Sequence, residues 1–219
     1  MIRAAIGGRS LYLCTSNRDH LLDFVSACVA GGVDVVQLRE KHLEARDLLR
    51  VGAELARCCA DLGVPFIVND RPDLALELDA DGVHVGQDDA PPALARRILG
   101  PDKIIGLSTH APDELGSGVL EPVDYLAAGP VVATPTKPSR EGTGVGYIET
   151  AVRATDGAAG GPVPLFITGG VTPSAITRLA AAGARRFVVE RYLTEAPDPR
   201  VAAGELRRAI DEAVERRSS

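Results

Sequence analysis

The sequence predicts a single-domain (β/α)8 barrel, in which eight parallel strands form a closed ring inside a layer of helices. Short runs rich in β-branched residues alternate with helical stretches almost from end to end, as in a series of βα units. Several of these runs are apolar on both faces, which is typical of strands covered by helices. The chain has 219 residues, and one such barrel occupies about 200–250. An open doubly wound sheet is the alternative topology.

The strands follow from short aliphatic runs that end in polar residues. Glycines stop the helices between them, and an amphipathic stretch from Ala202 to about Arg217 predicts a closing helix. The predicted strands are residues 11–15, 33–39, 65–68, 82–85, 104–107, 124–127, 164–168 and 187–190.

A faint internal repeat supports the closed barrel. Segments that begin at Gly31, Asp79, Glu121 and Ala182 each place small or acidic residues before an aliphatic strand. Their spacing corresponds to about two βα units, so they would be the even-numbered strands of an eightfold barrel.

The domain organisation is expected to be simple. Residues 1–219 form one domain, with residues 1–10 as an N-terminal extension. Residues 130–146 have no clear periodicity, and a connection this long in a compact domain is usually functional. We therefore expect this segment to be a mobile loop at the active site.

Composition excludes several classes of partner. A net charge of −6 and a pI near 5.3 argue against nucleic acid and anionic membranes. No apolar run approaches the ~18 residues that span a bilayer, and we expect no secretory leader. The four cysteines lack zinc-site spacing and indicate a reducing compartment. We expect a cytoplasmic protein.

Polar residues cluster where the predicted strands end, which is where barrels of this fold build active sites. After the second strand, period-two alternation places Gln37, Arg39 and, if the strand persists, Lys41 on one side. A guanidinium and an ammonium group close together favour a polyanion such as pyrophosphate. A solvated charge cluster is the alternative.

Carboxylates follow the third and fourth strands. Asp70 comes after Asn69, and Asp88 and Asp89 come after Gln87. Carboxylates from adjacent strands suit Mg2+, which takes one or two of them together with phosphate oxygens and water. We assign Asp89 as a ligand and Asp88 as a helix cap or a support for the site. Asn69 and Asp70 can also be simple turn residues.

Further candidates lie farther along the chain. Ser108 ends the fifth strand, and Thr134, Thr136 and Lys137 lie in the long loop, where they can close over a phosphate. Gly170 belongs to a two-glycine turn before a predicted helix start, a common phosphate site in these barrels. Ordinary polar turns are the alternative for all of these segments.

The histidines give no nucleophile–base pair. His84 lies inside the fourth predicted strand and is expected to be a hydrogen-bonded interior residue. His20 and His42 are expected at the surface, while His110 is undecided. The set of residues suits a reaction that needs little proton transfer by the protein.

Several segments together resemble the thiamine-phosphate synthase family, over residues 11–193 in unbroken order. They are QLREK at 37–41, ND at 69–70, DGVHVGQDD at 81–89, GLSTH at 106–110, YLAAGPVVATPTKPSREGTG at 125–144 and GG at 169–170.

The resemblance implies an Mg2+-dependent transferase. The family joins 4-amino-2-methyl-5-(diphosphooxymethyl)pyrimidine to a thiazole phosphate and releases pyrophosphate by a dissociative path. It implies metal binding by Asp70 and Asp89, and thiazole phosphate binding by Thr134, Thr136 and Gly170, with Glu190 and Arg191 at the same corner. It implies pyrimidine diphosphate contacts from Gln37, Arg39, Lys41, Asn69, Ser108 and Lys137, of which Arg39, Lys41, Ser108 and Lys137 would be catalytic.

One departure from the family pattern concerns the end of the eighth strand. Many members have Ile-Ser or Val-Ser there, whereas this chain has Glu190-Arg191. An arginine can replace a neutral phosphate donor with a charged one, but Glu190 would repel a phosphate unless it points away or pairs with an arginine.

Alternative functions remain open at this point. A thiazole tautomerase-like branch of the same superfamily carries a catalytic histidine where this chain has Pro130, which disfavours it. A barrel aldolase would use Lys137 to form a Schiff base, and a non-catalytic phosphate-binding regulator would not need the carboxylates. The expected partners are small heterocyclic phosphates, and a homodimer is compatible with the sequence.

Overall fold

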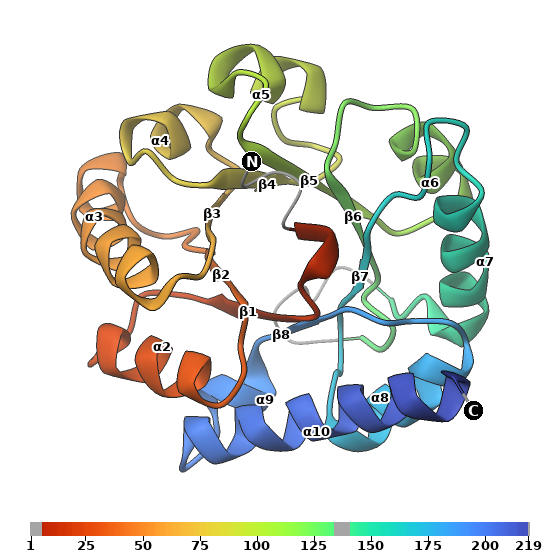
Figure 1. The fold of residues 1–219 in the computed structure, drawn as a ribbon. Coiled ribbons are helices and arrows are strands. Elements are labelled where there is room, and N and C mark those ends of the chain that lie inside the picture. The colour runs from red at the N-terminus through yellow and green to blue at the C-terminus, as the bar shows by residue number, and fades with distance from the viewer. Residues whose placement is uncertain (1–5, 134–140, 219) are drawn as a thin grey trace.

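The computed structural model describes residues 6–133 and 141–218. Its strands form a closed barrel in which each strand pairs in parallel with its neighbours in chain order, and β8 pairs with β1. Figure 1 looks along the barrel from the end at which the strands begin, with helices around the outside. The predicted closed barrel is confirmed, and the open doubly wound sheet is wrong.

The strands agree closely with the prediction. Two of them have the predicted bounds, and the others begin or end one or two residues away. In chain order they are β1 Leu11–Thr15, β2 Val35–Leu38, β3 Phe66–Asn69, β4 Gly82–Val85, β5 Ile104–Thr109, β6 Tyr125–Ala128, β7 Leu165–Ile167 and β8 Phe187–Val189.

The helices surround this ring. Several of them start with proline, whose fixed φ angle suits the first helical position. They are η1 Ile6–Gly8 (a 3-10 helix), α2 Leu21–Ala30, α3 Ala45–Leu62, α4 Pro72–Glu77, α5 Pro92–Leu99, α6 Pro112–Gly118, α7 Gly144–Asp156, α8 Pro173–Ala181, α9 Arg191–Thr194 and α10 Pro199–Ser218.

Two predicted boundaries differ from the structure. Helix α7 begins at Gly144, inside the segment predicted as a loop, because glycine content alone does not show where a buried apolar face begins. Residues 6–8 of the predicted N-terminal extension form η1, whose Ile6 side chain is buried.

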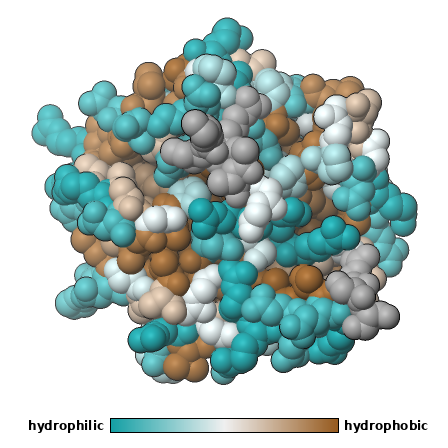
Figure 2. All heavy atoms as spheres, in the orientation of Figure 1, coloured by the Kyte–Doolittle hydropathy of each residue, from teal (hydrophilic) through white to brown (hydrophobic). Residues whose placement is uncertain are grey.

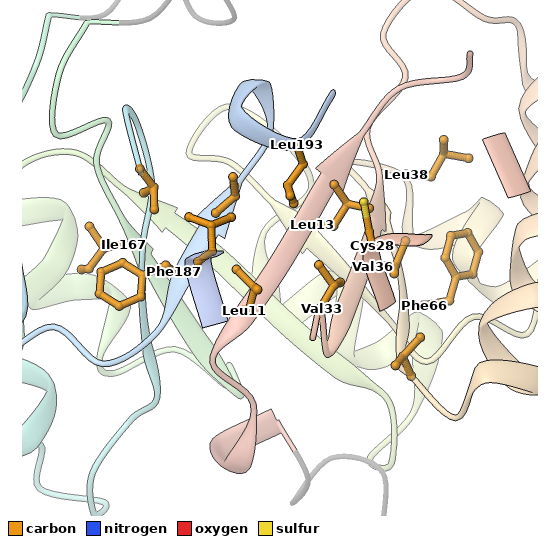
Figure 3. Packing of buried hydrophobic residues seen from close by; sticks show 14 of the residues in the cluster. Leu11, Leu13, Cys28, Val33, Val36, Leu38, Phe66, Ile167, Phe187 and Leu193 are labelled. Atoms are coloured by element: carbon orange, nitrogen blue, oxygen red, sulfur yellow. The ribbon is translucent and has the colours of Figure 1, made fainter. Parts of the chain in front are cut away.

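The strands separate two hydrophobic clusters. Alternate residues of β1, Leu11 and Leu13, face outward and belong to the same buried cluster as Cys28, Val36 and Leu193 (Figure 3). The residues between them face into the barrel. There a second cluster fills the half of the barrel interior nearest the end at which the strands begin. Its members are Ile6, Tyr12, Val35, Ile67, Ile104, Tyr125 and Phe166. The barrel interior is therefore a packed core below the site rather than an open pore.

The internal repeat corresponds to a structural role. An aspartate stands directly before β2, β4 and β6, and its carboxylate accepts an N–H from the preceding odd-numbered strand. The pairs are Asp34 with Leu11 (2.9 Å), Asp81 with Phe66 (2.8 Å) and Asp124 with Ile105 (2.8 Å). Before β8 the equivalent residue is Arg186, which donates to the carbonyl of Gly7. The repeat thus holds neighbouring strands together where they begin.

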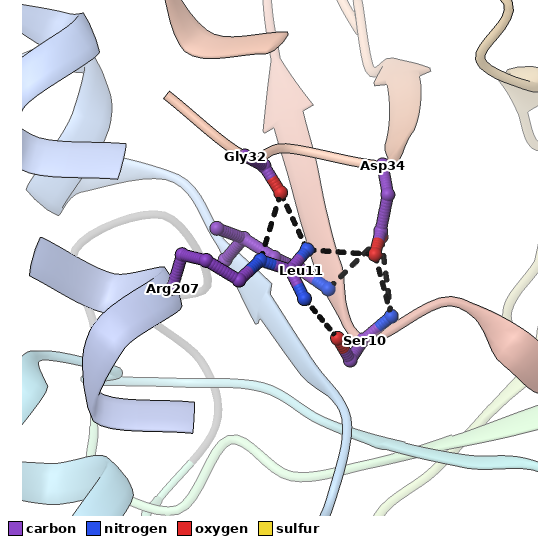
Figure 4. A network of polar contacts seen from close by, with 5 residues as sticks. All are labelled: Ser10, Leu11, Gly32, Asp34 and Arg207. Carbon is purple, nitrogen blue, oxygen red and sulfur yellow. Dashed lines mark hydrogen bonds and ion pairs between the residues drawn. The ribbon is translucent and has the colours of Figure 1, made fainter. Parts of the chain in front are cut away.

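The C-terminal helix closes the ring through one of these aspartates. The Arg207 guanidinium lies 2.7 Å from Asp34 Oδ2, donates to Ser10 Oγ at 2.6 Å and also donates to the carbonyl of Gly32 (Figure 4). The group therefore joins α10 to the start of β1 and β2. This polar network lies at the end of the barrel opposite the candidate site.

The surface at the end where the strands begin is mixed. Hydrophilic residues alternate with smaller hydrophobic areas across this face (Figure 2). In the described part of the chain, none of the helices combines the length and the apolar character that crossing a bilayer requires.

Candidate functional site

A cavity of about 580 Å³, here called the barrel-mouth cavity, opens where the strands end. The part of its wall inside the barrel is made by every second residue of the strands, because alternate side chains face inward. Along β2, β3 and β5 the inward residues change from apolar to polar toward the mouth. The pairs are Val35 and Gln37 on β2, Ile67 and Asn69 on β3, and Ile104 and Ser108 on β5. An apolar floor therefore supports a polar ligand chamber.

Arg39 and Lys41, the basic residues after β2, line this cavity as predicted, but Lys41 does so from a loop and not from the strand. Gln37 is buried on β2, and Arg39 extends the pairing through its N–H, which donates to the Thr15 carbonyl at 2.8 Å. Strand β2 ends at Leu38, so strand alternation does not carry Lys41 inward as the prediction supposed. The loop that follows brings Lys41 to the cavity, where half of its side chain is exposed.

The two predicted metal ligands come together. Asp70 adopts a left-handed conformation with φ 64°, and its N–H donates to the His84 carbonyl at 2.8 Å. Asp89 turns back toward its own loop, where Oδ2 accepts the Gly86 N–H at 2.8 Å. Burial raises the pKa of Asp70, and a side-chain hydrogen bond and charge repulsion with Asp89 raise it further, whereas Lys41 lowers it. The Lys41 Nζ lies 3.3 Å from Asp70 Oδ2.

The chemistry of this pair fits a divalent cation such as Mg2+. Two adjacent carboxylates that repel one another are stabilised by a divalent cation. Within residues 6–133 and 141–218, no three His, Cys, Asp or Glu side chains gather into a metal-binding group. Mg2+ commonly uses one or two carboxylates and completes its shell with phosphate oxygens and water. Asp70 and Asp89 satisfy that requirement.

Of the two roles expected for Asp88, helix cap or support for the site, the helix cap is wrong. Helix α5 begins at Pro92, and its N-cap is Pro91, because two successive prolines already fix the backbone for the first turn. Asp88 instead lines the barrel-mouth cavity next to Asp89.

A chain of hydrogen bonds crosses the floor of the cavity. Ser108 Oγ lies 2.8 Å from His84 Nε2, His84 Nδ1 lies 2.9 Å from the Tyr125 hydroxyl, and that hydroxyl lies 3.0 Å from the Tyr12 hydroxyl. All four residues are buried. Burial raises the pKa of both tyrosines well above the usual value, so both phenols remain protonated. The predicted hydrogen-bonded interior position of His84 is confirmed.

Strand register explains how this network forms. His84, Gly106 and Tyr125 are partners in one row across β4, β5 and β6. Because Gly106 has no side chain, the Tyr125 ring extends over β5 and stacks on His84, with ring centroids 5.5 Å apart. A Cβ at Gly106 would lie 2.1 Å from Tyr125 Cζ. Glycine at this position is therefore required by the tyrosine.

Gly106→Ala is expected to destabilise the protein by about 1–3 kcal/mol, because the added methyl forces Tyr125 off His84. Chemical denaturation would measure the free energy of unfolding. Gly116→Ala is the control, since its Cβ would meet nothing within 4 Å on the exposed side of α6, and alanine favours a helix over glycine. Equal stability of the Gly106→Ala variant and the unchanged protein would contradict the packing argument.

The opposite wall of the cavity has the features of an anion site. Gly169 and Gly170 both have positive φ, at 93° and 71°, which glycine adopts without strain. Thr172 caps α8 by accepting the Ala175 N–H at 3.2 Å, and Pro173 occupies the first helical position. Backbone N–H groups at a helix start of this kind favour phosphate.

Glu190 and Arg191 reach the same cavity. Glu190 is the N-cap of α9, and Arg191 is its first residue. Both line the cavity, as Gly170 does, and so does Glu195 from the end of α9. The structure therefore places an acidic and a basic residue side by side at the end of β8. Thr134, Thr136 and Lys137 lie outside the described residues.

Histidines outside the network have local roles. His20 and His42 are exposed, as predicted. His110 lies at the cavity wall, where its Nδ1 is bonded to the Gly129 carbonyl and its N–H donates to Glu114 Oε2 at 2.7 Å. His110 thus holds the end of β5 against the segment that leads into the long loop.

Sequence reasoning missed several cavity residues, chiefly Tyr12, Gln87 and Tyr125. Tyr12 and Tyr125 lie two residues before Cys14 and Ala127 on the same strands. Period-two alternation would therefore have indicated that both tyrosines face inward. Gln87 belongs to the DGVHVGQDD segment at 81–89, but the sequence suggested no function for it. In the structure its Nε2 donates to the Ser108 carbonyl at 2.7 Å.

Known proteins resemble this chain over nearly its whole length. The family model described as thiamine monophosphate synthase matches residues 11–193. A thiamine-phosphate synthase from Mycobacterium sp. (strain KMS) is 43% identical and one from Saccharopolyspora erythraea is 45% identical, with 94% of this chain covered in each case and 94% and 95% of the relatives. A solved thiamine phosphate pyrophosphorylase from Pyrococcus furiosus has a TM-score of 0.83 at 27% identity, covering 97% of this chain and 99% of that one.

Proposed function

This chain belongs to the thiamine monophosphate synthase family, and we propose that it couples 4-amino-2-methyl-5-(diphosphooxymethyl)pyrimidine to a thiazole phosphate with the help of Mg2+. Family membership makes it an alkyl transferase of thiamine biosynthesis. The observation that carries the finer proposal is the meeting of Asp70, Asp89 and Lys41 in one cavity with Arg39.

The first step breaks the bond between the exocyclic methylene carbon and the diphosphate oxygen. Pyrophosphate leaves with the bonding electron pair, and the amino-substituted ring donates electrons to the methylene carbon. Mg2+ bound by Asp70 and Asp89 would neutralise negative charge on the leaving group. Arg39 and Lys41 supply preorganised positive charge where that negative charge grows, which is usually the largest catalytic contribution. We propose the same role for Lys137.

The second step forms the carbon–nitrogen bond. The thiazole nitrogen donates its lone pair to the methylene carbon, so the positive charge moves onto the thiazolium ring and no proton transfer by the protein is required. We propose that Gly170 and the start of α8, with Thr134 and Thr136, bind the thiazole phosphate. Gln37 and Asn69, whose buried side chains line the cavity above its apolar floor, would hold the pyrimidine. Holding both reactants in place can contribute about 7–11 kcal/mol.

The corner formed by Glu190 and Arg191 is proposed to complete the thiazole phosphate site. The Arg191 guanidinium can donate to phosphate oxygens where a hydroxyl would otherwise do so. Glu190 lies beside it as the helix cap, close enough in sequence to limit the net positive charge of this corner.

A direct assay tests the proposal. Purified protein, Mg2+, the pyrimidine diphosphate and the thiazole phosphate should give thiamine phosphate, detected by mass, and one equivalent of pyrophosphate. Omitting any one component should abolish the product. Absence of thiamine phosphate with all components present would overturn the proposal, and trapping of a substrate on Lys137 by borohydride would favour an aldolase instead.

A further inference from the structure

The hydrogen-bond chain from Tyr12 to Ser108 can run in two directions. A neutral histidine donates from one ring nitrogen and accepts at the other, so the direction fixes the tautomer of His84. If Ser108 donates to His84 Nε2, His84 donates to Tyr125 and Tyr125 donates to Tyr12. The Tyr12 hydrogen then has no acceptor among the hydrogen bonds of residues 6–133 and 141–218.

The opposite direction gives each of the other hydrogens in the chain an acceptor and leaves the Ser108 hydrogen for the cavity. Tyr12 donates to Tyr125, Tyr125 donates to His84 Nδ1, and His84 Nε2–H donates to Ser108 Oγ. Tyr12 lies in the apolar floor with 1% of its surface exposed and packs edge-on against Phe166. A buried hydroxyl hydrogen without an acceptor costs free energy. Tyr12 is less exposed than Ser108, at 1% against 5%, so this direction places the one remaining hydrogen on the more accessible hydroxyl, at the cavity.

We propose that His84 is a positioning residue: as the neutral Nε2–H tautomer it donates to Ser108 Oγ, so that the Ser108 hydrogen is donated into the barrel-mouth cavity, to an oxygen of the substrate's diphosphate. This inference rests on the proposed function for the identity of that ligand. The serine cannot satisfy its own hydrogen on His84, whose Nε2 already carries one.

The surroundings of Ser108 support this role. Its carbonyl accepts from Gln87 and its hydroxyl accepts from His84, so two side chains from β4 and the turn after it hold the same residue at two points. The strand register brings Tyr125 opposite His84 across Gly106, and the absence of a side chain at Gly106 leaves space for the Tyr125 ring to stack on His84. A hydroxyl oriented in advance binds an anion without the cost of ordering it on binding.

The tautomer can be measured without any assumption about the reaction. In protein labelled with 15N at histidine, His84 is identified as the signal lost in His84→Gln. The expected spectrum shows a protonated Nε2 and an unprotonated Nδ1. A protonated Nδ1, with or without a protonated Nε2, would overturn the proposed direction.

A double-mutant cycle tests whether Tyr125 acts through Ser108. The readout is the affinity for inorganic pyrophosphate with Mg2+, measured by calorimetry. Ser108→Ala should weaken binding about ten-fold or more, because a hydrogen bond to a charged group is lost. Tyr125→Phe should weaken it several-fold in the wild type but by less than about two-fold in Ser108→Ala, because its partner is already absent.

Tyr147→Phe is the matched control. It also removes one buried hydroxyl, which donates to Thr109 Oγ1 at 2.9 Å outside this network, so pyrophosphate affinity should change by less than about two-fold. Equal losses for Tyr125→Phe in both backgrounds would show a purely structural effect and overturn the inference. If the tautomer and the cycle hold but no thiamine phosphate forms, the proposed function fails while the role of His84 in diphosphate binding stands.

Discussion

Asp70→Asn and Asp89→Asn are each expected to lower the rate of thiamine phosphate formation by at least about 10²–10³-fold. Each change removes one of the two charges proposed to bind Mg2+, while the side chain keeps its shape. Asparagine is chosen because Asp70 has φ 64°, which asparagine tolerates better than alanine. Single-turnover release of pyrophosphate at saturating substrate gives the rate.

Thermal unfolding separates loss of the metal site from loss of the fold. Because the pKa of Asp70 is raised in the folded protein, its ionised form costs stability at pH values above that pKa. Without Mg2+, Asp70→Asn should therefore melt at the wild-type temperature or higher at neutral pH, and the difference should disappear in acid. With Mg2+ and pyrophosphate at about 100 times Kd, the wild type should gain about 2.7 kcal/mol, or roughly 5–10 °C, and the variants much less.

Asp102→Asn is the matched control, since it removes the same charge from an exposed residue at the other end of the barrel. Its turnover and its ligand-induced melting shift should equal those of the wild type. Wild-type turnover in either Asp70→Asn or Asp89→Asn would remove that residue from the proposed metal site.

Arg39→Ala is expected to slow pyrophosphate release by about 10²–10³-fold, the size of effect seen when a preorganised donor to a developing charge is removed. Arg39 lines the cavity at the end of β2, on the wall that also carries Lys41. Single-turnover chemistry should fall more than substrate affinity does, because the charge on the leaving oxygen grows only in the transition state.

Arg39→Lys and Arg57→Ala sharpen this prediction. Lysine keeps the charge but loses the forked pair of donors, so its rate should lie between those of Arg39→Ala and the wild type. Arg57 is exposed on α3 outside the barrel, and its removal changes the net charge equally without an expected effect. Equal losses in Arg57→Ala and Arg39→Ala would mean that overall charge, and not position, accounts for the result.

The strands were largely predictable because their signals are local. A run such as Leu11–Thr15 is recognised from its own composition. The second strand was predicted too long because Val33 is also apolar, whereas pairing with β1 begins only at Val35. Lys41 shows the same difficulty in locating the end of a strand. Alternation along a longer strand predicted that Lys41 faces the cavity, and Lys41 does line the cavity, but from the loop after β2.

The site was predictable as a set of residues but not as a geometry. Asp70, Asp89, Arg39, Ser108 and Gly170 all line one cavity, as strand ends in this fold predict. Their hydrogen-bond partners were not predicted, because those come from strands distant in the sequence.

The sequence by itself determined the order of strands and helices, the inward alternation along each strand and the polar residues at each strand end, since all of these depend on near neighbours. Only the tertiary structure shows that Gly106 lies between His84 and Tyr125 in the strand register and lets their rings stack. It also shows that Tyr12 is hydrogen-bonded to Tyr125 and that Asp70 lies beside Asp89. Such contacts depend on the register between strands. Register is set by packing around the whole closed ring, which no single segment encodes.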